Sequence, residues 1–252
     1  MKHLLNILVF LIFLATNAQN TTLFESANKA YNEGEYQKSV DTYLQIIENG
    51  EHSAALYYNL GNAYYKLNAI APSIYYYEKA LLLSPNDTEI ENNLAYAKNM
   101  TLDAITPLPE TGLSKMKKNV INIMSFDQWA YTAIGLMFLF VLSYLAFYFL
   151  KYATQKRIAF IISILALICC ISAVVLGYVQ YADFNKDQPA IVFSTEVSIT
   201  SEPNTRSQEV FVLHEGTKVN VLNSLDEWTR ITIADGQTGW LPTKNIKLLK
   251  DF

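Results

Sequence analysis

WAYTAIGLMFLFVLSYLAFYFL, at residues 129–150, and IAFIISILALICCISAVVLGYV, at residues 158–179, each run for 22 residues without an Asp, Glu, Lys, Arg or His. At about 1.5 Å of rise per residue, a helix of that length measures about 33 Å and can cross the roughly 30 Å hydrocarbon core of a bilayer. Both stretches are therefore expected to be transmembrane helices. They divide the chain into two polar ends, which we expect to fold outside the bilayer.

The loop between the two apolar stretches, residues 151–157, carries Lys151, Lys156 and Arg157. A short and basic loop tends to stay in the cytoplasm, so both polar ends are expected on the extracytoplasmic side. The opposite flank, at residues 115–118, also carries three lysines. Counting charges on the two flanks therefore does not determine the orientation of the hairpin in the membrane, and the N-terminal segment is needed to predict it.

The N-terminus has the features of a secretory signal. Lys2 and His3 precede an apolar run at residues 4–14, and the small residues Thr16 and Ala18 precede a cleavage point before Gln19. Residues 1–18 are therefore predicted to be a signal peptide. The alternative is an uncleaved anchor, and it leads to the same topology, with the next residues outside.

Charge is distributed unevenly along the chain, whose net charge is −4. Residues 20–110 contain 5 lysines and 12 carboxylates, and residues 186–252 contain 7 cations and 9 carboxylates. Acidic or near-neutral domains are poorly suited to a phosphate backbone, so nucleic acid is not an expected partner. The two cysteines, Cys169 and Cys170, lie in the second apolar stretch, which leaves the polar ends without a disulfide.

Residues 20–103 repeat with a period of 34 residues: Asn28 recurs as Asn62, and Tyr43 recurs as Tyr77. This is the period of the tetratricopeptide repeat, which is a pair of antiparallel helices. The chain resembles tetratricopeptide proteins over this range, and we expect two full repeats and a capping helix. So short a stack buries little core by itself, so a bound partner or self-association is expected to help stabilise it.

Tetratricopeptide proteins present a concave groove lined by the first helix of each pair, and the resemblance implies which residues line it here. Asn amides can donate to and accept from a peptide backbone, while Tyr rings offer flat apolar area. Packing inside the stack is an equally expected role for each tyrosine. The implied groove residues are Phe24, Asn28, Tyr31, Tyr58, Asn59, Asn62, Tyr65, Lys66, Asn93 and Tyr96.

Some tetratricopeptide domains hold the terminal carboxylate of a partner with two Asn and several cations. Asn28 and Asn59 match the two Asn positions, but Phe24, Glu89 and Asn93 stand where cations are needed. A carboxylate is therefore a poor ligand for this groove, and we expect a neutral or basic peptide instead.

Residues 104–128 read as a linker that contains a helix. Pro107, Pro109 and Gly112 break regular structure first. Apolar residues then recur at helical spacing between lysines 115, 117 and 118. A basic amphipathic helix beside a transmembrane span is expected to lie on the lipid headgroups, and the alternative is a solvated charged linker.

Residues 188–250 change to short β-type runs with turn signals between them. EWTRI at 227–231, DG at 235–236 and GWLP at 239–242 resemble the bacterial SH3 family, which implies a small all-β barrel that binds cell-wall peptides or proteins. Trp228 and Trp240 are either barrel core or the ligand surface, with core expected for at least one of them.

Catalysis is not expected. Beyond residue 18 the only histidines are His52 and His214, and the polar ends contain no Cys, no HExxH and no phosphate-binding glycine loop. His52 falls in a turn between helices, where a solvated ring is the ordinary outcome. We expect neither a cofactor nor a metal ion.

The order of signal, tetratricopeptide pair, membrane hairpin and bacterial SH3 domain resembles the BatE-type family of the Bat (aerotolerance) operon. The resemblance implies an envelope scaffold that works with von Willebrand A-type membrane proteins and a MoxR-type ATPase in oxidative or aerobic stress tolerance.

The sequence as a whole predicts a multi-domain, non-enzymatic scaffold of the bacterial inner membrane. Its tetratricopeptide and SH3 domains are both expected to be periplasmic and to bind protein partners. One alternative is a peptidoglycan-binding protein that acts through the SH3 domain. A signal transducer is disfavoured, because the loop at residues 151–157 offers almost no docking surface.

Overall fold

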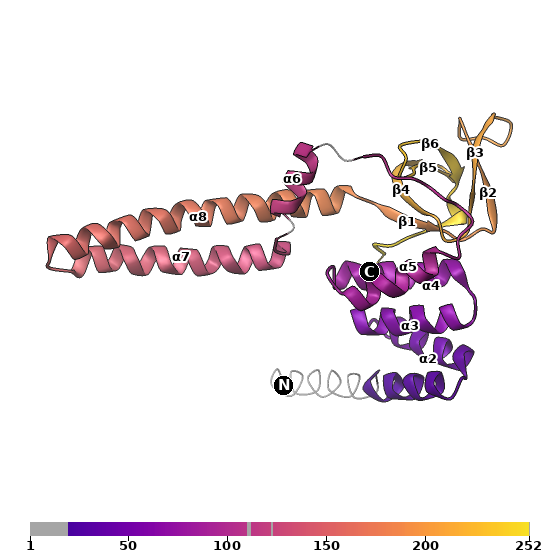
Figure 1. Ribbon diagram of the computed structural model, residues 1–252, viewed down its shortest axis with the longest axis horizontal. Coiled ribbons are helices and arrows are strands. Elements are labelled where there is room, and N and C mark those ends of the chain that lie inside the picture. Colours follow the sequence, from indigo (N-terminus) through magenta and orange to yellow (C-terminus); the bar gives the residue numbers. More distant parts are fainter. Residues whose placement is uncertain (1–19, 110–111, 122, 252) are drawn as a thin grey trace, which may run out of the picture. The chain divides into compact units, whose positions relative to one another are not determined.

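The structure is a computed structural model that describes residues 20–109, 112–121 and 123–251 (Figure 1). The chain forms two compact units. One combines the chain up to Pro107 with the chain from Gln188 onward, and the other comprises Leu108–Asp187. The predicted signal peptide lies outside the described residues.

Antiparallel helices form the N-terminal part of the first unit. The first described helix covers residues 20–32 and is followed by α2 (Tyr36–Glu48), α3 (Ala54–Lys66), α4 (Ile70–Leu83) and α5 (Thr88–Lys98). Side chains cap two of them: Ser53 Oγ accepts from the Leu56 amide, and the Asp87 carboxylate accepts from the amides of Glu89 and Ile90. Such caps satisfy amide groups that have no partner within the helix.

Helices α3 and α4 approach closely because residue 61 has no side chain. A Cβ atom on Gly61 would lie 2.7 Å from Tyr77 Cδ1. The Ser73 hydroxyl donates to the Gly61 carbonyl at 3.0 Å, and both Ser73 and Tyr77 are buried. A glycine facing a tyrosine therefore sets the spacing within this helical pair.

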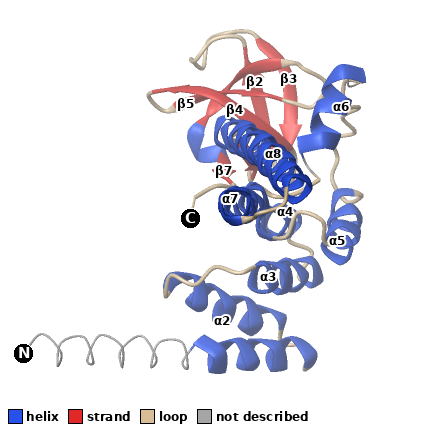
Figure 2. Ribbon diagram, turned by 90° about the vertical axis from the view of Figure 1, so that its left-hand side faces the viewer, coloured by secondary structure: helices blue, strands red, loops and turns tan. Residues whose placement is uncertain are grey.

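The C-terminal part of the first unit is a β domain (Figure 2). Its seven strands form one antiparallel sheet in the order β3-β2-β6-β5-β4-β1-β7. Alternate residues point inward, so Thr229 and Ile231 of β5 are buried while Arg230 between them is exposed. The strands are β1 (Pro189–Val192), β2 (Glu196–Thr200), β3 (Glu209–His214), β4 (Lys218–Leu225), β5 (Trp228–Thr232), β6 (Thr238–Pro242) and β7 (Ile246–Leu248).

The β domain packs on α4 and shares its core. Ile191 and Leu249, both at 0% exposure, belong to the same apolar cluster as Ile74 and Tyr75 of α4. The ring of Phe193 meets Tyr75 edge-on at 5.5 Å between centroids. The short helical stack is therefore stabilised by a domain of its own chain, a contact that the sequence pattern does not reveal.

The second unit consists of α6 (Gly112–Ile121), α7 (Phe126–Phe149) and α8 (Ala153–Lys186). Segments Asp127–Phe149 and Ala153–Lys186 are long and apolar enough to cross a membrane. Helix α8 meets α7 along a stripe of small residues, and the Cys170 thiol donates to the Ala133 carbonyl at 3.4 Å. Small side chains allow close helix packing of the kind found in membranes.

Helix α8 is longer than the apolar stretch expected at residues 158–179. It continues through Lys186, so its last turns are polar. Helix α6 occupies the range expected for the amphipathic helix, and Met116 and Val120 on it are exposed. The Trp129 indole donates to the Ile121 carbonyl at 3.0 Å, which ties the end of α6 to the start of α7. Lipid contact by α6 stays a prediction.

Candidate functional site

A polar hollow opens in the helical repeat between the first described helix, α2 and α3. Its volume is about 300 Å³. It is lined by amides and phenols, namely Asn28, Tyr31, Asn32, Tyr43, Asn59 and Asn62. Among the residues that the structure describes, no cation lines it.

Two identical hydrogen-bond triads, one repeat apart, fix the amides of this hollow. Asn28 Oδ1 accepts from the Tyr43 hydroxyl and from Asn59 Nδ2, the latter at 3.0 Å. One repeat later, Asn62 Oδ1 accepts from the Tyr77 hydroxyl at 2.6 Å and from Asn93 Nδ2 at 3.0 Å. We call this arrangement of Asn28, Asn59, Asn62 and Asn93 the asparagine ladder.

The triads leave complementary groups for a ligand. An Asn side chain has two acceptor positions on its oxygen and two N–H donors. The hydrogen bonds of the two triads use Oδ1 of Asn28, Oδ1 of Asn62 and Nδ2 of Asn59, so Nδ2 of Asn28, Nδ2 of Asn62 and Oδ1 of Asn59 take no part in the triads. Donors and acceptors in alternation match the alternating C=O and N–H groups of an extended peptide.

The tyrosines divide between packing and the site. Tyr43 and Tyr77 are almost fully buried, and their hydroxyl groups orient Asn28 and Asn62 of the asparagine ladder by hydrogen bonds. Tyr58 donates to Glu89 Oε1 at 2.7 Å and accepts from Asn93 Nδ2 at 2.8 Å. Burial, and secondly the hydrogen bond to Glu89, raises the pKa of Tyr58 to about 12. This phenol therefore stays neutral, and its hydrogen bonds persist at any physiological pH.

The structure brings together four of the residues that the sequence assigned to the groove: Asn28, Tyr31, Asn59 and Asn62. It adds Asn32 and Tyr43, which the sequence reading left out. Asn32 could have been predicted from the sequence, because it lies one helical turn after Asn28 and therefore on the same face of the helix. Phe24 packs against the Tyr43 ring, and the remaining positions do not line the hollow: Tyr58, Tyr65, Lys66, Asn93 and Tyr96.

Ion pairs hold the β domain on the helical repeat through α4. Glu78 on α4 is only 6% exposed, and its carboxylate meets Lys98 of α5 and Lys218 of β4, each at 2.7 Å. Lys79, also buried, pairs with Asp251 and lies 4.9 Å above the centroid of the Tyr57 ring. Buried charges need such partners, because desolvation alone would be costly.

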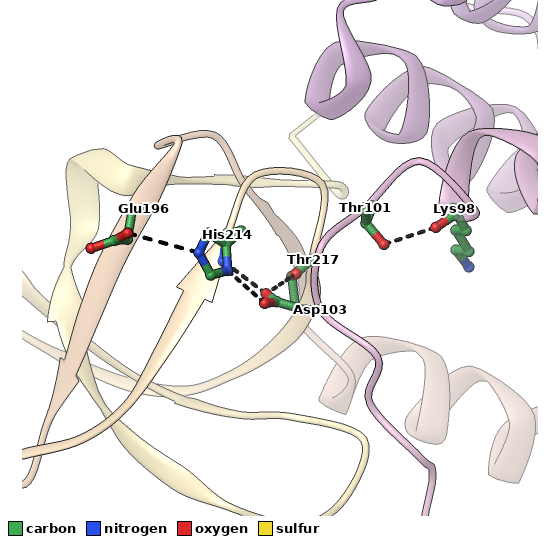
Figure 3. A network of polar contacts seen from close by, with 6 residues as sticks. All are labelled: Lys98, Thr101, Asp103, Glu196, His214 and Thr217. Atoms are coloured by element: carbon green, nitrogen blue, oxygen red, sulfur yellow. Dashed lines mark hydrogen bonds and ion pairs between the residues drawn. The ribbon is translucent and has the colours of Figure 1, made fainter.

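A second polar cluster joins the chain after α5 to the β domain (Figure 3). The carboxylate of Asp103 accepts from the backbone amide of His214 at 2.7 Å and from the Thr217 hydroxyl at 2.6 Å. His214 Nδ1 lies 2.7 Å from the same carboxylate, and its Nε2 lies 3.8 Å from Glu196. The histidine that the sequence left unassigned thus belongs to the domain contact.

The pKa of the Glu78 carboxyl is held below its ordinary value. Burial alone would raise this pKa, but the charges of Lys218 and Lys98 and their hydrogen bonds more than offset it. The pKa values of Asp103 and Asp251 are likewise lowered, because hydrogen bonds and charges from the opposite domain outweigh desolvation. All three carboxylates are therefore ionised at neutral pH.

Acid is expected to weaken this contact only below about pH 4. A lowered pKa means that the ionised Glu78 contributes stability above its unfolded value of about 4.3, and that this contribution is lost as the pH falls through the folded value. The measurement is the free energy of unfolding in urea as a function of pH. Glu78→Gln should flatten the acid limb, while the exposed Glu227→Gln should not; identical profiles for Glu78→Gln and wild type would contradict the assignment.

The two tryptophans lie on the outer face of the β sheet. Antiparallel register places Arg230 opposite Trp240 and Trp228 opposite Pro242, so these four side chains share a face. Both tryptophans are partly exposed, and neither belongs to the buried core. The expectation that at least one is core therefore does not describe this structure.

Comparison with known families matches part of the helical repeat and most of the β domain. The bacterial SH3 domain matches residues 196–247, which contain β2 to β6 and most of β7. The tetratricopeptide repeat matches residues 54–87, which contain α3 and α4. The chain thus carries a tetratricopeptide repeat and a bacterial SH3 domain together with two apolar helices. No curated protein matches the chain.

Proposed function

We propose that this protein is a non-enzymatic, membrane-anchored scaffold that binds an extended peptide segment of a partner protein in the groove of its tetratricopeptide domain. The observation that carries the proposal is the asparagine ladder, whose amides are pre-oriented by buried phenols. A rigid row of donors and acceptors binds a peptide backbone without first having to order itself. Tetratricopeptide and bacterial SH3 domains both suggest binding rather than chemistry.

The anchor is the hairpin of α7 and α8. Residues before and after it make contact within one compact unit, as Glu78 does with Lys218, which supports their location on the same side of a membrane. Lys151, Lys156 and Arg157 between the helices favour a cytoplasmic loop. Both soluble domains are then periplasmic, on the outer side of the inner membrane of a bacterium.

The ligand is a neutral or basic peptide. The described residues that line the hollow include no cation, and residues 20–110 carry 12 carboxylates against 5 lysines. A segment in the middle of a partner chain suits this charge better than a carboxyl terminus. Through the BatE-type resemblance, the candidate partners are von Willebrand A-type membrane proteins of a MoxR-type ATPase system, and the process is oxidative or aerobic stress tolerance.

The groove is tested by crosslinking in whole cells with a reagent that cannot cross the cytoplasmic membrane. The double variant Asn59→Ala/Asn62→Ala is expected to lose capture of its protein partner, because it removes donors and an acceptor. Asn62→Asp keeps the acceptor for Tyr77 and Asn93 but removes the N–H donors, so it should also lose capture. Asn86→Ala, an exposed Asn in the turn between α4 and α5, is the matched control.

Two results would overturn the proposal. Undiminished capture by Asn62→Asp, with urea unfolding unchanged, would remove the ladder as the binding site. Crosslinking that appears only after the cells are permeabilised would reverse the orientation.

A second candidate function, binding to peptidoglycan, is favoured by the face of Trp228, Arg230 and Trp240. Indole rings stack on sugars and peptides, and a guanidinium pairs with the carboxylates of wall peptides. If this is the function, the full-length protein should sediment with purified wall sacculi. The Trp240→Ala variant should no longer co-sediment with the sacculi. The Asn59→Ala/Asn62→Ala variant should co-sediment as the wild type does.

A further inference from the structure

We propose that the hairpin of α7 and α8 binds one anionic phospholipid at its loop end. An acyl chain lies in a hollow between the two helices, and the phosphate lies beside the cations of residues 151–157. The inference rests on the proposed membrane anchor, and it adds a specific lipid site to that anchor. Every residue that carries it belongs to the second compact unit.

A hollow of about 360 Å³ opens between the C-terminal half of α7 and the first turns of α8, and we call it the hairpin hollow. Its lining recurs every three or four residues on each helix, so it follows one face of the hairpin. From Gln155 to Ile162 the helix rises about 10 Å, which is about a third of the hydrocarbon core. The lining includes Ser143, Ala146, Gln155, Ile158, Ala159 and Ile162.

The hairpin hollow is open at the side of the hairpin. Ala159 is only 7% exposed, whereas Ile158 is 54% exposed and Ile162 is 41% exposed. A small side chain therefore lies deep in the hollow, and larger apolar side chains stand at its rim. Within a bilayer, a groove of this kind is filled either by an acyl chain or by another helix.

The loop end of the hairpin carries a positive charge that the hairpin itself does not balance. Lys151, Lys156 and Arg157 lie there, and residues 128–182 contain no Asp or Glu. Lys151 and Arg157 are exposed, while Lys156 Nζ lies 5.9 Å from the centroid of the Phe147 ring. Cations at the end of a membrane span attract anionic headgroups. The charge therefore selects an anionic headgroup as the polar part of the ligand.

The apolar and cationic parts meet at Gln155. This residue lines the hairpin hollow two positions before Arg157, and its amide can donate hydrogen bonds. Helix α8 begins at Ala153 without a side-chain cap, so the amides of its first turn add donors for phosphate oxygens at the same end. A phospholipid has an apolar chain and a charged head in the same order. A helix of a partner protein would fill the apolar part without supplying the negative charge.

The headgroup is tested by native mass spectrometry of the full-length protein in a neutral detergent, titrated with phosphatidylglycerol or with phosphatidylcholine of the same acyl chains. We expect the first phosphatidylglycerol to bind more tightly than the first phosphatidylcholine. Lys151→Gln/Arg157→Gln should reduce this preference about 25-fold, because each cation at a membrane surface contributes about fivefold. Lys156 is kept for its contact with Phe147. The matched control, Lys115→Gln/Lys186→Gln, removes two exposed lysines at the other end of the hairpin and should keep the preference.

Filling the hairpin hollow tests the place of the acyl chain. Ala146→Phe adds a ring to the lining without a change of charge, so the tight first binding of phosphatidylglycerol should be lost. Ala130→Phe, at an exposed alanine near the opposite end of α7, is the matched control and should bind as the wild type does. Unchanged binding by Ala146→Phe or by Lys151→Gln/Arg157→Gln would overturn the proposal, as would equal affinity of the wild type for both lipids.

A separate measurement distinguishes this site from the anchor on which it rests. Alkaline carbonate should leave the wild-type protein in the membrane pellet. If it does, and the two lipid-site variants still bind phosphatidylglycerol as the wild type does, only the lipid site fails. If carbonate releases the wild type, the anchor fails and the lipid site fails with it. If Ala146→Phe loses capture of a protein partner in whole cells but binds lipid normally, the hollow takes a partner helix and the proposal is wrong.

Discussion

The Gly61→Val variant is expected to lose about 3 kcal/mol of stability in its helical repeat, because overpacking a core forces side chains and backbone apart. A Cβ at this position would lie 2.7 Å from Tyr77 Cδ1 and 2.8 Å from its Cε1. The tyrosine ring cannot retreat without breaking its hydroxyl bond to Asn62. The change should therefore disorder the asparagine ladder along with the packing. Urea unfolding followed by far-UV circular dichroism measures the loss.

Gly135→Val in α7 provides the matched control. A Cβ there meets nothing within 4 Å, so the same added side chain should leave unfolding of the first unit unchanged. Gly61→Ala adds only the Cβ and should fall between the two. A Gly61→Val protein as stable as wild type would show that α3 and α4 are not held as close as described.

The Leu249→Ala variant is expected to cost about 3 kcal/mol, within the range for a fully buried leucine that leaves a cavity. Leu249 is 0% exposed and packs in the cluster that α4 shares with the β domain. The neighbouring Leu248 is 40% exposed, so Leu248→Ala should change stability little, by about 0.5 kcal/mol or less. Comparing Leu249→Ala with Leu248→Ala separates the loss of packing in the shared core from any general effect of shortening a leucine in this segment.

The same experiment reports whether the two domains unfold together. In a Trp129→Phe background, tryptophan fluorescence follows the β domain through Trp228 and Trp240, and circular dichroism follows the helices. The wild-type transitions should coincide, and Leu249→Ala should shift both to lower urea. Two separate wild-type transitions would contradict a shared core.

The helices could be predicted from sequence because their signals are local. An uncharged run of 22 residues or a 34-residue period can be read from neighbouring positions, and the structure has α7, α8 and the pair α3–α4 in those places. The asparagine ladder follows from the same period, since Asn28 and Asn62 occupy equivalent positions. Seven antiparallel strands follow the alternation after residue 188; closure of the sheet into a barrel stays a prediction.

The docking of the β domain had no local signal. Glu78 and Lys218 are 140 residues apart, and Tyr75 and Asp251 are 176 residues apart. Glu and Lys at such positions read as solvated surface until the fold joins them. His214, for which the sequence predicts no role, likewise lies against Asp103, 111 residues away. His52 is exposed, as expected, and its Nδ1 lies 2.5 Å from the Tyr57 hydroxyl, five residues along the chain.

The position of Leu249 in the chain has a consequence for assembly. The ribosome makes this residue after both apolar helices, yet it completes a hydrophobic surface on α4, which is made before them. If α7 and α8 form the proposed membrane hairpin, a chain in which only one of them crosses the bilayer would leave the two halves on opposite sides and Ile74 and Tyr75 uncovered. Under the proposed topology, docking thus distinguishes correctly inserted molecules from misinserted ones, in which the apolar surface of α4 stays exposed.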